Sequence, residues 1–303
     1  MKRLHPHFRW KEFVVETLVR MTGISAIFFV LLIMIFLFRE AAPAFLEVPL
    51  EDLFGTRWYP IEGFYGIVPL LLGSIWVTIG AVVLSVPLGL ATAVFIREIA
   101  PGWVREILKP LIEILAGIPS VVLGFLGWVV VAPLVQDWLG APTGLTVFTG
   151  SLMLAYMALP TIISISEDAI DAVPKTYRDG ALALGATHWQ TIWRVVIPAA
   201  RSGVLMAIML GVGRAIGETM AVMMVTGNAA TLPRGLASFL RPARTMTATI
   251  AAEMGEVAQG GTHYHVLFAI GLMLFGITLL INVFASVLML RQERGGGRGG
   301  MIG

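Results

Sequence analysis

Long runs of apolar residues recur along the chain, separated by short segments that are rich in polar residues. A helix that crosses a bilayer needs roughly 20 apolar residues, because each residue adds about 1.5 Å to a core about 30 Å thick. One long run is interrupted by Arg201, Arg214 and Glu218, whereas the others are almost free of charge. The pattern predicts six membrane-spanning helices, which lie within residues 21–38, 63–96, 114–136, 138–166, 195–226 and 266–290.

The composition supports the same class of protein. Hydrophobic residues make up 57% of the 303 positions and charged residues only 13%, against about 25% charged in soluble domains. A net charge of +2 provides no basic patch for nucleic acid, and the absence of cysteine excludes a disulfide-stapled secreted domain. We therefore predict an all-α integral membrane protein whose solvent is the lipid bilayer.

Lysine and arginine residues are divided unequally between the two sides that these spans define. Most of them lie near the termini, between the second and third spans, and between the fourth and fifth spans. Positive charge marks the cytoplasmic side of a membrane protein. Both termini are therefore predicted to be cytoplasmic, and the few basic residues on the opposite side are Arg39, Arg57, Arg234, Arg241 and Arg244.

The chain is predicted to form one membrane domain with two short flanking segments. Residues 1–20 carry an amphipathic pattern, so we expect an interfacial helix along the cytoplasmic membrane surface. Residues 21–290 make up the transmembrane domain, and the glycine-rich residues 291–303 are expected to form a flexible cytoplasmic tail.

The longest polar segment on the cytoplasmic side, residues 166–194, predicts two short helices joined by a turn. Pro174 can begin the first helix, Gly185 permits a sharp turn, and Thr187 or His188 can cap the second helix. Such a helical hairpin is typical of a surface on which a partner protein docks. An ordinary amphipathic loop is the simpler alternative.

This segment also resembles a loop that permease subunits of bacterial ABC importers share, with the pattern E-A-A, three residues, G, nine residues and I-x-L-P. The chain has Asp-Gly-Ala, three residues, Gly, nine residues and Val-Val-Ile-Pro, so the spacing matches although several residue types differ. The resemblance implies the type I ABC importer permease fold, with short coupling helices that fit a groove on an ATPase subunit. The residues that it implies for ATPase coupling are Asp179, Gly180, Ala181, Gly185, His188 and Trp189.

Two charges within the fifth predicted span, Arg214 and Glu218, are four residues apart. On a continuous helix they share one face and can pair. A charge near the bilayer centre costs at least about 2.5 kcal/mol, so it is expected to face a water-filled path or other protein. The functional interpretation is a substrate pathway, and the structural alternative is a pair that only neutralises itself inside the bundle.

A guanidinium matches two oxygens of a tetrahedral oxyanion, and phosphate is such an anion. Phosphate, unlike sulfate, carries a proton at neutral pH and can donate it to a carboxylate. We therefore hypothesise that Arg214 attracts phosphate, while Glu218 tests for the phosphate O–H group and restrains Arg214 when the path is empty.

Three longer motifs resemble the PstC family of permease subunits of phosphate importers: Leu-Ala-Gly-Ile-Pro-Ser from residue 115, Arg-Ala-Ile-Gly-Glu-Thr-Met-Ala-Val from residue 214, and Ala-Thr-Ile-Ala-Ala-Glu-Met-Gly-Glu from residue 248. The likeness covers nearly the whole chain and implies a multi-pass protein of the bacterial inner membrane. It implies that Arg214 and Glu218, with Thr219 beside them, belong to the substrate pathway. Ser120, which follows a Pro119 break, is a weaker pathway candidate, because a packing kink explains the proline equally well.

The resemblance implies a complete importer with a PstA-like second permease, a PstB-like ATPase dimer and a PstS-like phosphate-binding protein. The chain has no G-x-x-x-x-G-K-[ST] motif, so ATP and Mg²⁺ are expected on the separate ATPase subunits. We expect no cofactor, no metal and no catalysis on this chain, and we interpret His263 and His265 as solvated loop histidines. A permease for molybdate or sulfate and an ion-coupled secondary transporter are the alternative functions.

Overall fold

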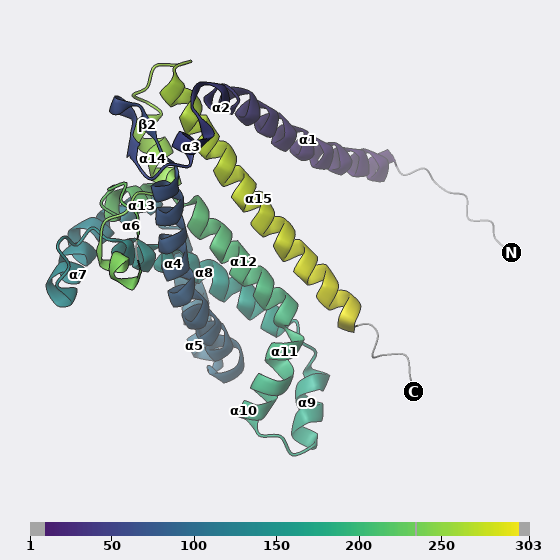
Figure 1. Cartoon of the computed structure of the whole chain (residues 1–303). Helices are drawn as coiled ribbons and strands as arrows, with labels where there is room; N and C mark the ends of the chain where they lie inside the picture. The colour runs from purple at the N-terminus through teal and green to yellow at the C-terminus, as the bar shows by residue number, and fades with distance from the viewer. Residues whose placement is uncertain (1–9, 234, 297–303) are drawn as a thin grey trace.

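The computed structural model describes residues 10–233 and 235–296, and these residues are mostly helical. One end of the molecule holds a small cap, formed by residues 44–65 and 244–265, and the other holds the short helices of the 166–194 segment (Figure 1). The longer helices are α1 (Trp10–Ala41), α4 (Val68–Val94), α5 (Gly102–Ala116), α8 (Val147–Asp171), α12 (Arg201–Gly217) and α15 (Thr262–Gly296).

Short elements connect the long helices. The first six are α2 (Ala44–Glu47), α3 (Leu50–Leu53), β1 (Trp58–Tyr59), η1 (Pro60–Glu62), β2 (Phe64–Tyr65) and η2 (Phe95–Ile99). They are followed by α6 (Ser120–Leu126), η3 (Gly127–Val131), α7 (Ala132–Leu139), α9 (Lys175–Ala183), α10 (His188–Thr191) and η4 (Ile192–Val196). The last four are α11 (Ile197–Ala199), α13 (Met220–Val225), η5 (Leu236–Leu240) and α14 (Met246–Glu253). Strands β1 and β2 pair as an antiparallel hairpin.

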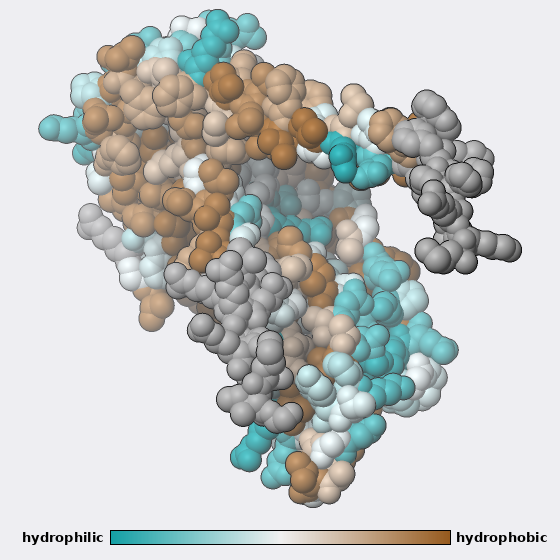
Figure 2. All heavy atoms as spheres, turned by 90° about the vertical axis from the view of Figure 1, so that its right-hand side faces the viewer, coloured by the Kyte–Doolittle hydropathy of each residue, from teal (hydrophilic) through white to brown (hydrophobic). Residues whose placement is uncertain are grey.

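The helices that are long and apolar enough to cross a membrane confirm the predicted class. Among the described residues, five single helical segments qualify, and a sixth qualifies if the pair His188–Ala199 and Arg201–Gly217, bent by 71°, counts as one span. Hydrophobic side chains cover much of the upper and middle part of the face in Figure 2, whereas hydrophilic ones gather toward its lower end. The five segments are Phe13–Glu47, Val68–Ile99, Ser120–Leu139, Val147–Asp171 and Thr262–Val287.

Small residues bring α4, α8 and α12 together at the centre. Gly80 of α4 faces Ser151 of α8. Gly89 of α4 and Gly211 of α12 both face Ile162 of α8. A Cβ atom on any of these three glycines would come within 2.7 Å of a side-chain atom of α8. Close approach through small residues replaces the hydrophobic driving force that lipid removes. The contacts also show that α4 and α8 run parallel.

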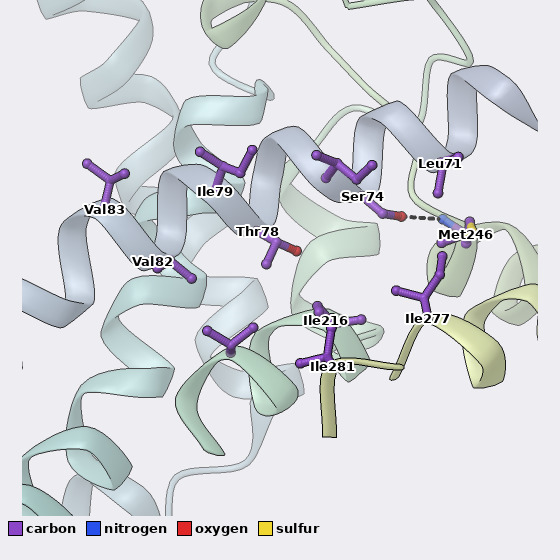
Figure 3. A pocket seen from close by; sticks show the side chains of 12 residues that line it. Leu71, Ser74, Thr78, Ile79, Val82, Val83, Ile216, Met246, Ile277 and Ile281 are labelled. Atoms are coloured by element: carbon purple, nitrogen blue, oxygen red, sulfur yellow. Dashed lines mark hydrogen bonds between the residues drawn. The ribbon is translucent and has the colours of Figure 1, made fainter. Parts of the chain in front are cut away.

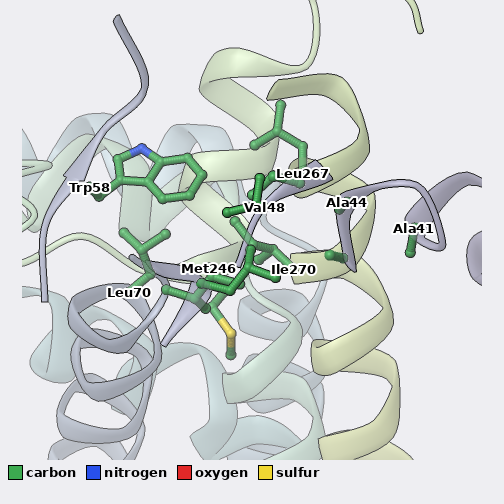
Figure 4. Close-up of a cluster of buried hydrophobic side chains, with 12 residues drawn as sticks. Ala41, Ala44, Val48, Trp58, Leu70, Met246, Leu267 and Ile270 are labelled. Atoms are coloured by element: carbon green, nitrogen blue, oxygen red, sulfur yellow. The ribbon is translucent and has the colours of Figure 1, made fainter. Parts of the chain in front are cut away.

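Helix α1 diverges from this bundle and contacts the rest of the chain mainly near its C-terminal end (Figure 1). There Phe36 stacks edge-on against Phe268 of α15 at 5.7 Å. Beyond α1, the segment that connects it to α4 packs into an apolar cluster at the cap end of the molecule, shown in Figure 4. Its buried members include Ala41, Ala44, Val48, Trp58, Leu70, Met246, Leu267 and Ile270.

The predicted third span, residues 114–136, is wrong in its boundaries. Helix α5 ends at Ala116, and a new helix begins at Ser120 and continues to Leu139. Pro119 has no N–H group and cannot continue the hydrogen bonding of α5, while its fixed φ suits the residue before a new helix. Helix α5 is therefore a separate element, which the apolar run did not reveal.

The structure also bears on the two flanking segments. Helix α1 is continuous from Trp10, so no break separates the predicted interfacial segment from the first span, and residues 1–9 lie outside the described residues. The expected flexible tail is helical at its start, because α15 extends to Gly296. Residues 297–303 lie outside the described residues.

Gly73 of α4 offers a test of this packing. A Cβ atom at this position would come within 2.2 Å of the Arg244 carbonyl oxygen, a backbone atom that has little room to move. We expect Gly73→Ala to destabilise the protein by about 1–3 kcal/mol. Gly276→Ala is the matched control, because a Cβ atom there meets nothing within 4 Å. The measurement is thermal unfolding in detergent, monitored by size-exclusion chromatography. The midpoint temperature of unfolding should fall for Gly73→Ala only, and equal midpoints for the two variants would refute the close packing.

Candidate functional site

The fifth span is broken at Glu218, four residues after Arg214. Helix α12 ends at Gly217, Glu218 is extended with φ −68° and ψ 131°, and α13 begins at Met220. The predicted ion pair is therefore wrong, since Arg214 and Glu218 form none within residues 10–233 and 235–296. Pairing across four residues requires an uninterrupted helix.

Arg214 is exposed in this chain and has few partners. Its Nη1 atom donates a hydrogen bond of 3.3 Å to Oγ1 of Thr161 on α8. A guanidinium carries five N–H donors, so most of its hydrogen-bonding capacity is left for a ligand. Thr161 was not predicted, because nothing in the sequence indicates which turn of α8 faces α12.

Glu218 is half-buried and is held by its backbone and its side chain. Its carboxylate accepts a hydrogen bond of 3.2 Å from the Ala221 N–H at the start of α13. Its carbonyl oxygen accepts one of 2.9 Å from Oγ1 of Thr247. Thr219, also half-buried, donates from its hydroxyl to the Gly217 carbonyl oxygen at 3.2 Å. The polar groups of the break are thus satisfied locally, without Arg214.

The break before Ser120 lies beside this one. A Cβ atom on Gly124 of α6 would come within 2.9 Å of the Ala221 Cα atom on α13, and one on Gly127 within 2.8 Å of the Val225 side chain. Helices α6 and α13 are therefore parallel and in close contact. This register places the half-buried Ser120, one turn before Gly124, on the side of α13 where Gly217 and Glu218 lie.

A segment from the loop between the last two spans enters the bundle and lies against Glu218. We call residues 241–253 the re-entrant segment. Ala243 N–H bonds to the Thr226 carbonyl oxygen at 2.9 Å, Met246 N–H bonds to Oγ of Ser74 at 2.9 Å, and Thr247 reaches Glu218. Its threonines are all at most 7% exposed, and they are Thr245, Thr247 and Thr249. These hydroxyls within an apolar stretch are the sequence signal that could have revealed the segment.

Glu253, at the outer end of α14, joins three side chains from different parts of the cap. Its Oε1 atom accepts hydrogen bonds from Arg244 at 2.7 Å and from the Trp58 indole N–H at 3.1 Å. Its Oε2 atom lies 2.8 Å from Nε2 of His263. The expectation of solvated loop histidines is therefore wrong, because His263 bonds to Glu253 and Nδ1 of His265 lies 2.9 Å from the Glu40 carbonyl oxygen. Among the described residues no cluster of three or more His, Cys, Asp or Glu side chains could hold a metal ion.

The predicted hairpin of short helices is confirmed at the opposite end of the molecule. Helix α9 ends in a turn at Gly185, whose φ of +83° favours glycine, and Ala186 N–H bonds back to the Ala181 carbonyl oxygen at 3.1 Å. Thr187 then caps α10 in a reciprocal arrangement with Gln190. Of the six predicted coupling residues, Ala181 is half-buried and Asp179, Gly180, Gly185, His188 and Trp189 are exposed.

The hairpin is fixed to the spans by a largely buried ion pair. Arg178 of α9 bonds to the Glu98 carboxylate through Nη2 at 2.7 Å and Nε at 3.2 Å, and the two side chains are 16% and 8% exposed. The same guanidinium donates to the carbonyl oxygens of Val173 at 2.6 Å and Ile170 at 2.9 Å. Arg178 therefore connects α9 to the end of α4 and to the end of α8.

Other ion pairs surround Arg178 and hold the same helix ends. Arg97 pairs with Asp171, and Lys109 of α5 pairs with Glu167 at 2.9 Å. The hydrogen bond that Lys109 donates to Glu167 raises the pKa of Lys109 above its ordinary value, so the lysine stays charged at physiological pH. Separate ion pairs therefore connect the end of α8 to α5 and to the segment that follows α4.

An apolar hollow of about 330 Å³ lies between α4, α12 and α15 (Figure 3). Its lining carries no charged side chain, and Ser74, its polar member near the cap, is bonded to Met246 N–H. An anion would lose its hydration there without gaining a partner. The hollow is therefore not the site of Arg214 chemistry.

Comparisons with known proteins agree with this architecture. Residues 85–295 match the family described as the binding-protein-dependent transport system inner membrane component. The chain is 41% identical over 247 residues to the probable ABC transporter permease protein YqgH of Bacillus subtilis, covering 81% of this chain and 79% of that protein. It is 34% identical over 313 residues to the phosphate transport system permease protein PstC of Pasteurella multocida, covering 96% of each chain.

Solved structures support the fold. A bacterial alginate ABC transporter in complex with an alginate-bound periplasmic protein gives a TM-score of 0.64 at 16% identity, covering 93% of this chain and 97% of that chain. An inward-facing MetNI methionine transporter gives 0.60 at 18% identity, covering 78% and 99%. These matches establish that the chain belongs to the binding-protein-dependent transport system inner membrane component family, as a membrane-spanning permease subunit and not an enzyme.

Proposed function

We propose that this chain is one permease subunit of an ATP-driven importer that moves inorganic phosphate across the bacterial inner membrane by alternating access. The observation that carries the proposal is Arg214, a largely unpartnered guanidinium beside a helix break in the middle of a span. Relatives named as phosphate permeases cover most of the chain at 34–36% identity and support this substrate. Both termini are proposed to lie in the cytoplasm.

The chemistry of the site suits a protonated oxyanion. Arg214 supplies a charged fork for two phosphate oxygens. Glu218 lies four residues later, on the extended turn, and offers a carboxylate that can accept a hydrogen bond from a phosphate O–H group. Thr219 and Ser120 contribute hydroxyls at the two neighbouring breaks. A fully deprotonated sulfate would meet only repulsion at Glu218, which gives the site a basis for selectivity.

The remaining subunits follow from this role. A PstA-like permease would complete the pathway, a PstS-like binding protein would deliver phosphate at the cap, and a PstB-like ATPase dimer would bind ATP and Mg²⁺. The ATPase would dock on the hairpin formed by α9 and α10, where Leu184 is 91% exposed and Trp189 57% exposed. Movement of α9 would pass through Arg178 and Glu98 to α4, and so to the spans that surround Arg214.

Arg214 can be tested directly. We expect Arg214→Ala to lower ATP-dependent uptake of labelled phosphate at least about tenfold, since charge-assisted hydrogen bonds contribute about 1.5–3 kcal/mol each. Uptake should be measured into vesicles that contain the assembled complex, with excess sulfate present. Arg201→Ala is the matched control, because Arg201 is an exposed arginine at the other end of the same helix. Normal uptake by Arg214→Ala would remove this residue from the pathway, and no phosphate uptake by the wild-type complex would favour another oxyanion such as molybdate.

The role of Glu218 predicts a change in selectivity. Glu218→Gln removes the repulsion of sulfate and retains the shape of the side chain, so the ratio of phosphate to sulfate uptake should fall about tenfold, roughly 1.4 kcal/mol of discrimination. The measurement is competition between the two labelled anions in the same vesicles. A reduced rate with an unchanged ratio would contradict the selectivity role while leaving Arg214 untouched.

The connection between hairpin and spans predicts a coupling defect. Lysine at position 178 keeps the charge and loses the fork that holds Glu98 and two carbonyl oxygens. We expect Arg178→Lys to reduce phosphate transported per ATP hydrolysed about threefold or more, because the hairpin then moves without carrying α4 with it. Arg194→Lys is the control, since Arg194 is exposed in the same segment. An unchanged ratio of transport to hydrolysis in Arg178→Lys would show that coupling does not pass through this pair.

A further inference from the structure

The hydrogen bond between Thr247 and Glu218 lies at the break between α12 and α13. Thr247 is 7% exposed, and its hydroxyl donates to the Glu218 carbonyl oxygen at 2.9 Å. In a continuous helix that carbonyl oxygen would accept from an N–H group four residues later, but the extended backbone at Glu218 turns it toward α14. The hydroxyl of another segment thus replaces a helical hydrogen bond.

The break has a direct electrostatic consequence. If α12 continued without interruption into α13, Arg214 and Glu218 would lie on one face at a spacing of four residues and could pair. In the broken helix they form no ion pair among the described residues, and Arg214 bonds to a neutral hydroxyl on α8. Whatever stabilises the break therefore keeps the guanidinium available.

Thr247 is itself held firmly. Oγ1 of Thr245 caps α14 by accepting from Ala248 N–H at 3.2 Å. Oγ of Ser74 accepts from Met246 N–H at 2.9 Å, which fixes Met246 to α4 (Figure 3). Gly73 permits the close approach of the Arg244 backbone to the same helix. At its outer end the segment is secured by the ion pair between Arg244 and Glu253. The hydroxyl is therefore presented by a rigid support.

We propose that Thr247 is a positioning residue that keeps α12 and α13 separate at Glu218 and so holds Arg214 unpaired for an incoming oxyanion. The inference rests on the proposed function, because it assigns Arg214 to anion binding. Thr247 itself does not contact the anion. Removing its hydroxyl leaves the Glu218 carbonyl oxygen without this donor. The backbone recovers a donor by becoming helical, which brings Glu218 onto the face of Arg214.

The test compares Thr247→Val with Thr247→Ser in vesicles that contain the full complex. Valine has nearly the shape of threonine but no hydroxyl, whereas serine keeps the donor. We expect Thr247→Val to raise the KM for phosphate about fivefold to tenfold, as expected for one lost hydrogen bond to a buried group, and Thr247→Ser to restore it. Thr249→Val is the matched control, because Thr249 is fully buried and its hydroxyl bonds only to Thr245 O within its own helix.

A second comparison separates positioning from general damage. In a Glu218→Gln background no carboxylate remains to neutralise Arg214, so Thr247→Val should raise the KM no further. An additional rise there, an equal rise in Thr249→Val, failure of Thr247→Ser to restore the KM, or an unchanged KM in Thr247→Val would each overturn the inference. Absence of phosphate uptake by the wild-type complex is a different result, which refutes the proposed function itself.

Discussion

A helix within hydrocarbon cannot stop unless its last carbonyl groups and the first N–H groups of the next helix find new partners. The arrangement of this protein around Arg214 follows from that constraint. The Glu218 carboxylate accepts a hydrogen bond from the Ala221 N–H group, and the Thr247 hydroxyl donates one to the Glu218 carbonyl oxygen. The re-entrant segment is needed because it brings the hydroxyl of Thr247, which is 7% exposed, to this carbonyl oxygen. Its own backbone is satisfied in turn by Ser74 and by the Thr226 carbonyl oxygen.

The glycines explain how so much backbone fits around one point. Gly73 admits the Arg244 backbone beside α4, and Gly124 admits the start of α13 beside α6. Each of these contacts replaces side-chain volume with backbone, so polar groups of neighbouring segments come within hydrogen-bonding distance. A bundle packed with large side chains could not hold the break before Ser120 and the break at Glu218 side by side. The broken helices therefore depend on the close packing at these glycines.

The sequence predicted those features that depend on local pattern. The apolar runs indicated the spans, and the turn and capping residues from Pro174 to Thr187 indicated the docking hairpin, because their structural preferences are set within a few residues. The pairing of Arg214 with Glu218 was wrong for a physical reason. Spacing alone assumes a continuous helix, whereas the backbone at Glu218 is decided by Thr247, a residue 29 positions away in the sequence. Helix α5 was missed because its apolar face blends into the following span.

The two ends of the molecule connect to the central break by different physical routes. At the hairpin end, the buried charges of Arg178 and Glu98 are costly to separate, so α9 and the end of α4 are expected to move together. At the cap, Glu253 bonds to Arg244, Trp58 and His263. Thr247, which lies between Arg244 and Glu253 in the sequence, donates to the Glu218 carbonyl oxygen. Helix α4 takes part in both routes, through Glu98 just beyond its inner end and Ser74 near its outer end. A displacement of α4 caused at the hairpin would therefore act on the same Ser74 contact that supports Thr247. Through this one helix, the proposed docking of an ATPase would change the availability of Arg214.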